Sequence, residues 1–359
     1  MPASKKTPPS LTQSDPERSF EFEFVRACEN AALNSIHWLG RGDKESADAA
    51  ACDAINGCFD LIDMCGEVVI GEGQKDNAPG IFLGDRLGNW RKGAPKFAIA
   101  LDPIDGTTNI SKGMPNSISV MAAVYVPPGG GAGLVNIPTF YSEKLAYGPQ
   151  VAEMMRKEKF FRFDLDTPTE EIIEKTARML GKNVKQVVTV VLDRPRHEKT
   201  IQAIRGMGAS LRLIADGDIT AAIAPSLPDS GVDLYMGIGG SPEGVLTAAA
   251  LRTLGGDLQL RMWVRDEEER TRIAGDPQAK NLRHIYHADE LAFGPSALFC
   301  VTGISDNPLT KGVKFVGRRA ITHTLLMRAR SRTVRYIKAY HDLDKKTIHL
   351  RSDDGEHLV

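Results

Sequence analysis

The sequence predicts an α/β protein with two packed, sheet-containing halves. From about residue 169 onward, short apolar segments alternate with segments of helical periodicity, which is typical of helices that cover a sheet. Before that point, two long helical segments are followed by apolar runs of strand length. The chain has 359 residues, more than one ordinary hydrophobic core organises, so two halves are expected.

The first half is predicted to span residues 20–165, after a tail at 1–19. The tail contains Pro, Ser and Lys and lacks the apolar centre of a signal peptide, so we predict that it is disordered. The expected elements are helices over 20–39 and 46–64, the second with Ser46 as N-cap, and strands over 67–70, 97–101 and 117–126.

The second half is predicted to span residues 166–359. Charged residues at 156–159 and the stretch 164–169 interrupt the packing pattern and mark the boundary. The expected elements are strands over 187–192, 211–215 and 234–238 and helices over 197–207, 219–224 and 243–254.

Composition excludes several classes of protein. Hydrophobic residues make up 42% and charged residues 25% of the chain, with a formal net charge of −1, so a general nucleic-acid binder is not expected. No apolar stretch has the length of a membrane span. Five cysteines in a chain of this length do not form a secreted disulfide framework, and we expect a cytoplasmic protein.

The most informative segment is residues 102–109, Asp-Pro-Ile-Asp-Gly-Thr-Thr-Asn, which follows an apolar run. Pro103 and Gly106 favour a tight turn that holds the carboxylates of Asp102 and Asp105 close together at the strand end. Such carboxylates raise each other's pKa unless a cation lies between them, and Mg²⁺ or Mn²⁺ suits an oxygen cluster. The alternative is an Asx-turn on a surface loop.

Three more acids are candidates for the same site. Glu72 lies between two glycines at a strand end, although Gly-Glu-Gly also makes a simple turn. Asp48 lies early in the second helix, where an acid also complements the helix dipole. Glu243 follows Ser241 and Pro242, the expected N-cap and first residue of a helix whose free N–H groups favour an anion, and a plain helix cap is the alternative.

Two polar motifs follow predicted strands, where α/β sheets bind ligands. Arg194 and Arg196, separated by Pro195, suit an anionic group, and the alternative is a solvated loop. Residues 216–218, Asp-Gly-Asp, follow the next strand, where Asp218 could instead be only a helix N-cap.

Other candidate patterns carry weaker signals. No P-loop, Gly-x-Ser-x-Gly, Cys-x-x-Cys or His-Glu-x-x-His motif is present. His284 and His287 have helical spacing beside acids, which we interpret as a charged surface stretch rather than a metal site. Arg328, Arg330 and Arg332 would share one face of a strand, which we interpret as a solvated or intersubunit face rather than a phosphate site.

These motifs, in this order, resemble class II fructose-1,6-bisphosphatases, a family of the lithium-sensitive, metal-dependent phosphomonoesterases. The resemblance covers residues 20–341 and is carried by the segments 38–48, 69–73, 102–108, 194–197, 216–218 and 237–244. Inositol monophosphatases instead carry a late Trp-Asp pair, and none of Trp38, Trp90 or Trp263 is followed by aspartate.

The resemblance implies a layered α/β/α/β/α sugar-phosphatase fold and assigns roles to residues. It implies that the metal ligands are Asp48, Glu72, Asp102, Asp105 and Glu243. It implies that Thr107 positions the attacking water and that the sugar bisphosphate is held by Lys44, Asp105, Gly106, Thr107, Tyr141, Arg194, Pro195, Arg196, Asp216, Gly217, Asp218 and Gly240. Many class II members have glutamate, which is one methylene longer, at the position of Asp105. Others share this aspartate, so the difference concerns the spacing of the metal ions and not the activity.

The chemistry of the residues agrees with this assignment. Hydrolysis of a phosphomonoester needs its negative charge offset, and two divalent ions roughly 3.5–4 Å apart do this while activating water. An all-carboxylate ligand set favours Mn²⁺ or Mg²⁺, two or more ions per site, over zinc. The Thr107 hydroxyl, oriented by Asp48, can relay a proton from the water.

The expected function is therefore hydrolysis of the 1-phosphate of fructose 1,6-bisphosphate in gluconeogenesis. The alternatives are a dual or primary sedoheptulose-1,7-bisphosphatase, an inositol monophosphatase-type enzyme and a non-catalytic sugar-phosphate sensor. The resemblance also implies a homo-oligomer, a tetramer or a dimer, whose partner is a small sugar bisphosphate and not nucleic acid or a membrane.

Overall fold

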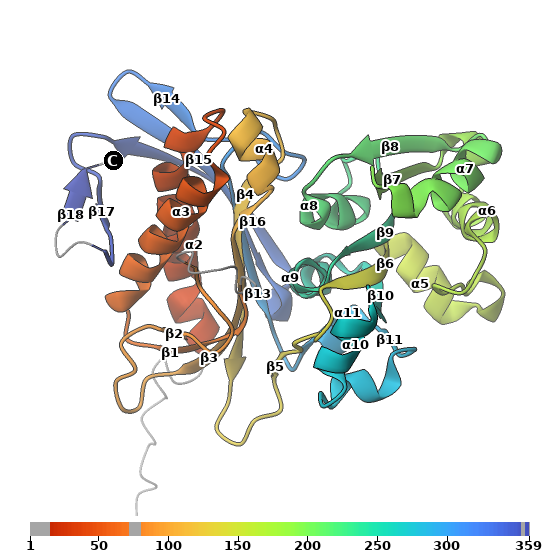
Figure 1. Ribbon diagram of the computed structural model, residues 1–359, viewed down its shortest axis with the longest axis horizontal. Coiled ribbons are helices and arrows are strands. Elements are labelled where there is room, and N and C mark those ends of the chain that lie inside the picture. The colour runs from red at the N-terminus through yellow and green to blue at the C-terminus, as the bar shows by residue number, and fades with distance from the viewer. Residues whose placement is uncertain (1–14, 72–79, 353–355, 359) are drawn as a thin grey trace, which may run out of the picture.

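The computed structural model describes residues 15–71, 80–352 and 356–358 of the chain (Figure 1). Glu72, one of the predicted metal ligands, lies outside these residues, as does most of the predicted N-terminal tail. The molecule is a mixed α/β structure with two large sheets. In the described residues, no helix is long and apolar enough to cross a membrane.

The first sheet has eight strands in the order β14-β15-β13-β4-β3-β1-β2, with β16 paired to β15. Only β1 and β3 pair in parallel; the other pairs in this sheet are antiparallel. The strands are β1 (Cys65–Ile70), β2 (Arg86–Leu87), β3 (Lys96–Asp105), β4 (Ile118–Val126), β13 (Leu298–Gly303), β14 (Lys314–Val316), β15 (Arg319–Arg328) and β16 (Thr333–Asp342).

The second sheet has six strands in the order β11-β10-β6-β9-β7-β8. Strands β8, β7 and β9 are parallel, whereas β6 runs antiparallel to β9 and β10. The strands are β6 (Tyr141–Tyr147), β7 (Val188–Leu192), β8 (Ser210–Ile214), β9 (Leu234–Gly240), β10 (Asp257–Trp263) and β11 (Ile285–Tyr286).

The chain passes between the sheets twice. Strand β6 belongs to the second sheet although its residues fall in the predicted first half, and β13 to β16 return to the first sheet. The boundary predicted at residues 165/166 therefore does not coincide with the division between the sheets. Strand pairing across long sequence separations, which the order of elements does not reveal, decides this division.

Three large hydrophobic clusters, beside a small one of Leu33, Ala54, Ala320 and Ile348, hold the described elements together. One joins helices α2 (Pro16–Ser35) and α3 (Lys44–Asp60) to the first sheet, and the edge-to-face rings of Phe24, Phe59 and Phe97 lie in it. A second joins α5 (Pro149–Lys157), α6 (Thr169–Leu180) and α7 (Glu198–Gly206) to the second sheet.

The third cluster lies between the two sheets. Helix α9 (Ser241–Leu254) is buried in it and contacts strands of both sheets, including β3, β4, β6 and β10. Helices α8 (Asp218–Ile223) and α11 (Ala288–Leu291) pack beside α9. A helix rich in Ala, Leu and Val suits this place because every side of it is covered by apolar residues.

The remaining elements are short. They are α4 (Thr107–Lys112), α10 (Glu267–Ile273), β5 (Gly133–Leu134), β12 (Ala292–Phe293), β17 (Thr347–His349), β18 (Glu356–Leu358) and the 3₁₀ turns η1 (Ile36–Trp38), η2 (Lys159–Phe161), η3 (Val184–Gln186), η4 (Pro195–His197), η5 (Ala224–Ser226), η6 (Gln278–Asn281) and η7 (Ala329–Ser331).

Several local predictions are wrong by a few residues. The N-cap of α3 is Asp43, whose carboxylate accepts a hydrogen bond from the Ser46 backbone, rather than Ser46 itself. The N-cap of α9 is Gly240, and Ser241 is the first helical residue. The arginine run at residues 328–332 is not one strand, because β15 ends at Arg328 and a turn follows.

Candidate functional site

The acidic segment is a bulge inside strand β3 rather than a loop beyond its end. Its pairing with β4 shifts register between Asp102 and Asp105, and the strand ends at Asp105. Gly106 then adopts a left-handed conformation with φ of 90° and caps α4. A Cβ at Gly106 would lie 2.3 Å from the Asn116 carbonyl oxygen, so both backbone angle and close packing require glycine here.

Glu243 lies in the first turn of α9, directly after the end of β9. Its carboxylate folds back over Gly240: a Cβ at Gly240 would lie 1.9 Å from Glu243 Oε2. The absence of a side chain at Gly240 is therefore what allows the carboxylate to occupy this position.

The acids from the separate motifs act on one another electrostatically. Burial, followed by the charges of Glu243 and Asp48, raises the pKa of Asp102. Burial, then Asp102, Asp218 and Glu243, raises the pKa of Asp105. Acids carried by α3, β3, α8 and α9 thus share one poorly solvated region.

The pKa of Glu243 is shifted by burial and neighbouring charges as well. Burial and the charge of Asp218 raise its pKa to about 7, although Lys144 opposes the shift. Oε2 of Glu243 and Oδ2 of Asp105 are buried and accept no hydrogen bond from the described residues. Buried carboxylate oxygens without donors are suited to a hard divalent cation.

The described residues do not by themselves complete a metal cluster. Among residues 15–71 and 80–352, no three His, Cys, Asp or Glu side chains are grouped tightly enough to hold a metal ion. Glu72, which is also a predicted metal ligand, lies outside the described residues.

Lys144 is a central residue of the site that the sequence analysis missed. It projects from β6 with only 1% of its side chain exposed, and its Nζ lies 2.6 Å from Asp218 Oδ2. The Tyr235 hydroxyl donates to the same oxygen at 3.2 Å. Lys144 occupies an inward-facing position between Ser142 and Ala146, so strand alternation is the signal that could have revealed it.

The Asp-Gly-Asp motif follows β8, leads into α8 and contacts the start of α4. Gly217 caps α8 with φ of 84°, and its N–H donates to Asp216 at 3.1 Å. Burial raises the pKa of Asp216, while hydrogen bonds from the backbone of Gly217 and Thr108 oppose the shift. The Thr108 contact places this loop against the segment that carries Thr107.

The two arginines lie at the carboxyl edge of the parallel strands. Arg194 Nη2 donates to the Ala215 carbonyl at 2.6 Å, and Arg196 donates to the Ile238 carbonyl at 2.8 and 3.1 Å. The Arg196 guanidinium stacks on the ring of Tyr141, 4.9 Å from its centroid. Tyr141 reaches this edge because β6 runs antiparallel and begins there.

His197, within the quoted motif but given no role by the sequence, orients the arginine turn. It is 2% exposed, its Nδ1 lies 2.7 Å from the Leu192 carbonyl, and its Nε2 accepts from the Ile238 N–H at 2.7 Å. This pair of contacts requires the neutral Nδ1–H tautomer, and burial lowers the pKa of His197. The ring thereby ties the end of β7 to β9.

The sequence is similar to known proteins over nearly its whole length. The family model for bacterial fructose-1,6-bisphosphatase, glpX-encoded, matches residues 18–341. The chain belongs to this family. It is 39% identical over 338 residues to the class 2 fructose-1,6-bisphosphatase of Haemophilus influenzae strain Rd, covering 91% of this chain and 97% of the relative. It is 36% identical over 340 residues to fructose-1,6-bisphosphatase 1 class 2 of Escherichia coli K12, with 92% and 97% covered.

Two of the residues implied by the family resemblance, Lys44 and Thr107, make none of the contacts described above. Lys44 is exposed at the start of α3, and its ammonium makes no ion pair with a carboxylate of the described residues. Thr107 is half-buried at the first position of α4, and its hydroxyl makes no hydrogen bond to the described part of the chain. The roles of these two residues stay predictions.

Replacing Lys144 by methionine is expected to lower the free energy of unfolding by about 3 kcal/mol, because the buried carboxylate of Asp218 loses its counter-ion. The control is Lys157→Met, which removes an exposed ion pair with Glu153 and should change stability by less than about 0.5 kcal/mol. Urea unfolding of both variants measures the difference. Equal effects would show that Lys144 contributes no more than a surface lysine.

Proposed function

We propose that this protein hydrolyses the 1-phosphate of fructose 1,6-bisphosphate to give fructose 6-phosphate and phosphate, the reaction of its family in gluconeogenesis. The observation that carries the proposal is that carboxylates of α3, β3, α8 and α9 meet in one poorly solvated region, next to a strand edge that also presents two arginines. Carboxylates suit divalent ions, and guanidinium groups suit the phosphates of a bisphosphate.

The proposed metal ligands are Asp48, Glu72, Asp102, Asp105 and Glu243. The buried oxygens of Asp105 and Glu243 that lack hydrogen-bond donors fit this role. Mn²⁺ or Mg²⁺ bound there would offset the charge of the phosphate and lower the pKa of the attacking water.

The protein's own residues supply positioning and proton transfer. We assign to the Thr107 hydroxyl the task of accepting a hydrogen bond from the attacking water, with the Asp48 carboxylate orienting that hydroxyl. Because Thr107 opens α4 beside the Asp102–Asp105 bulge, a water held by its hydroxyl would lie next to the acids.

The substrate is proposed to lie along the carboxyl edge of the second sheet. Tyr141, Arg194 and Arg196 would hold the sugar bisphosphate, and Pro195 fixes the spacing of the two arginines. The remaining contacts are assigned to Lys44, Asp105, Gly106, Asp216, Gly217, Asp218 and Gly240. Asp218, already bound by Lys144 and Tyr235, is rigid enough to recognise a sugar hydroxyl.

Three broader features are proposed with this function. The order of helices and sheets in Figure 1 supports the layered α/β/α/β/α sugar-phosphatase architecture, with residues 20–165 supplying most metal ligands and 166–359 most substrate contacts. A homo-oligomer, tetramer or dimer, is expected and is measured by light scattering. The cytoplasm is the expected location.

The activity itself is tested by phosphate release from a panel of fructose 1,6-bisphosphate, sedoheptulose 1,7-bisphosphate and inositol 1-phosphate, with Mn²⁺ and with chelator. Fructose 1,6-bisphosphate should give the highest kcat/KM, and both chelator and Asp102→Asn should reduce it by about 10²-fold or more. A higher kcat/KM for the sedoheptulose ester would favour the alternative, and tight binding without release would indicate a sensor.

Gly240→Ala should lower kcat/KM by about tenfold to 10²-fold, because the new methyl group displaces the Glu243 carboxylate. Its backbone angles, φ of −61° and ψ of 139°, are accessible to alanine, so the fold should be retained. Gly275→Ala is the matched control, since a Cβ there meets no atom within 4 Å. Unchanged kcat/KM in Gly240→Ala would remove Glu243 from the reaction.

Metal binding should also change the pH dependence of stability. The pKa of Glu243 is raised from 4.5 to about 7, so its protonated form favours folding at low pH and this contribution is lost as the pH rises through about 7. Mn²⁺ binds the ionised form, so it should raise the melting temperature more at about pH 8 than at about pH 5.5. Glu243→Gln should reduce that difference, and equal shifts at both pH values in the parent protein would contradict the assignment.

A further inference from the structure

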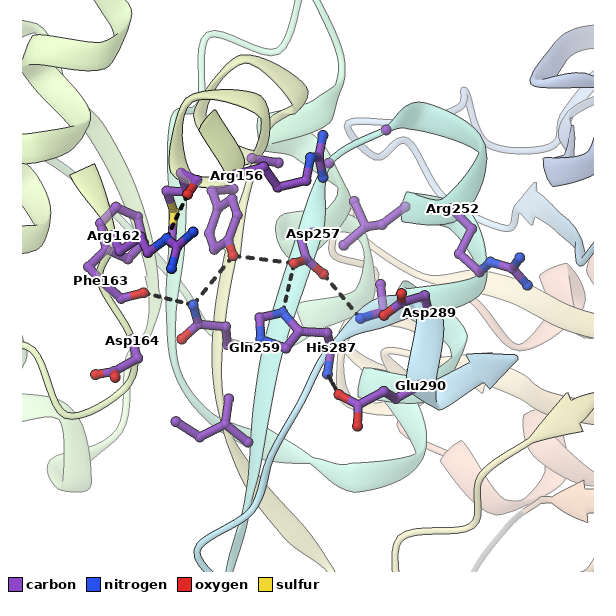
Figure 2. Close-up of a pocket in the computed structure, with 18 of the residues that line it drawn as sticks. Arg156, Arg162, Phe163, Asp164, Arg252, Asp257, Gln259, His287, Asp289 and Glu290 are labelled. Atoms are coloured by element: carbon purple, nitrogen blue, oxygen red, sulfur yellow. Dashed lines mark hydrogen bonds and ion pairs between the residues drawn. The ribbon is translucent and has the colours of Figure 1, made fainter. Parts of the chain in front are cut away.

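A second site lies at the opposite end of strand β6 from the acidic region. There a cavity of about 1190 Å³ is bordered by α5, the segment 162–167, the end of α9, the start of β10, α11 and the β15–β16 turn (Figure 2). Tyr147, at the end of β6, lines this cavity, whereas Tyr141 begins the same strand at the proposed active site. The two ends are about 20 Å apart along the strand.

The cavity wall contains an ordered polar network centred on Asp257 (Figure 2). Its carboxylate accepts hydrogen bonds from the Tyr147 hydroxyl at 3.3 Å, His287 Nδ1 at 2.8 Å and the Ala288 N–H at 3.1 Å. The bond to Asp257 raises the pKa of His287. A protonated His287 held in this way keeps its Nε2–H to donate to a ligand.

Gln259 adds a buried acceptor whose bonding is incomplete. Its side-chain nitrogen donates to the Phe163 carbonyl at 3.0 Å and to the Tyr147 hydroxyl at 3.3 Å, which uses both amide hydrogens. Gln259 is 2% exposed and lines the cavity, yet its Oε1 accepts no hydrogen bond from the described residues. A ligand that brings a hydroxyl group to this oxygen would satisfy it.

Three arginines on the cavity wall, Arg156, Arg162 and Arg332, have no carboxylate partner within the described chain. Arg162 is held by a bond from its Nε to the Met155 carbonyl at 3.2 Å, which leaves its terminal nitrogens available. Arg252, on the other side of Asp257 in Figure 2, differs because it donates to two backbone carbonyls.

Of the acids on the cavity wall, Asp164, Asp257 and Glu290 are engaged in hydrogen bonds, whereas the carboxylate of Asp289, beside Arg252 in Figure 2, has no hydrogen-bond partner among the described residues. Asp164 accepts from the Asp166 N–H and the Thr167 hydroxyl, and Glu290 accepts from His284 and from the His287 N–H. The unengaged groups of the wall are therefore the three arginines and one buried neutral acceptor, together with the carboxylate of Asp289 on α11.

We propose that this cavity binds a small phosphorylated metabolite that carries hydroxyl groups. Arg156 and Arg162, joined by His287, would bind the phosphate, because forked guanidinium donors match its oxygens. The Gln259 carbonyl oxygen would accept from a hydroxyl. The site lies outside the proposed active site and uses none of its residues.

The ligand would contact two elements that also reach the active site. Helix α9 carries Glu243 in its first turn and Leu251 at the cavity, eight residues or about 12 Å along the helix. Strand β6 carries Tyr141 at one end, Lys144 at its middle and Tyr147 at the other end. Both are rigid elements of the core between the sheets.

The test is a ³¹P NMR titration of the full-length protein carrying Arg194→Ala and Arg196→Ala, so that the proposed active site does not contribute, with ribose 5-phosphate, inorganic phosphate and, as its neutral counterpart, ribose followed by ¹H NMR. The phosphorus signal also shows whether the ester stays intact, so binding is read without turnover. Ribose 5-phosphate should bind saturably, inorganic phosphate more weakly and ribose not at all. The double variant Arg156→Ala/Arg162→Ala should weaken binding about tenfold or more, since two charge-assisted contacts are lost.

Two controls separate this site from the surface and from the active site. Lys157→Ala removes a neighbouring charge on α5 that does not line the cavity and should leave binding unchanged. The parent protein, with Arg194 and Arg196 intact, should show a second binding event at the proposed active site in addition to the cavity binding. In the Arg194→Ala/Arg196→Ala protein, the absence of saturable binding of either phosphate would overturn the proposal. Undiminished binding after Arg156→Ala/Arg162→Ala is added would overturn it as well. Equal affinities for ribose 5-phosphate and inorganic phosphate would overturn the hydroxyl contact to Gln259. Phosphate release from fructose 1,6-bisphosphate is scored separately, so failure here leaves the proposed function standing.

Discussion

The repulsion between buried carboxylates is the constraint on which the functional site depends. Asp102, Asp105 and Glu243 each have a raised pKa because burial and neighbouring negative charges disfavour their ionised forms. Lys144 offsets part of this charge through its buried ion pair with Asp218. The rest must be neutralised by protons or by a bound cation, which links folding, pH and metal binding at one place.

The fold places segments of both sheets next to one another at the site. The first sheet contributes the bulge of β3, and the second contributes the carboxyl ends of β7, β8 and β9 together with the start of β6. Helix α9 packs against both sheets and places Glu243 between them. The fixed core around α9 therefore holds groups in place that would separate if they were free to move.

The same core connects two regions of opposite character. One end of β6 and α9 faces the acids, whereas the other borders a cavity lined by three arginines without a carboxylate partner in the described chain, by His287 bonded to Asp257, by the unbonded oxygen of Gln259 and by the carboxylate of Asp289. His197 and Asp257 play comparable roles in the two regions, since each fixes its neighbours through several hydrogen bonds rather than facing ligand alone. In both regions, hydrogen bonds to a central side chain therefore fix the positions of the neighbouring groups.

The sequence by itself determined the α/β class, the family and most of the local elements. Asp102, Asp105 and Gly106 were recognisable because their chemistry is written in consecutive residues, and the helix that carries Glu243 was expected within two residues of its observed start. The sequence did not determine the N-cap of α3, because Asp43 and Ser46 are both good capping residues and the three-dimensional context selects between them.

Only the tertiary structure decided which strands share a sheet and which charges meet. The return of β13 to β16 to the first sheet and the place of β6 in the second depend on pairing between distant residues, which local propensity does not encode. Lys144 and Gln259 show the same limit: a lysine or glutamine in a strand is ordinarily exposed, and the packing of helices over both faces is what buries these two.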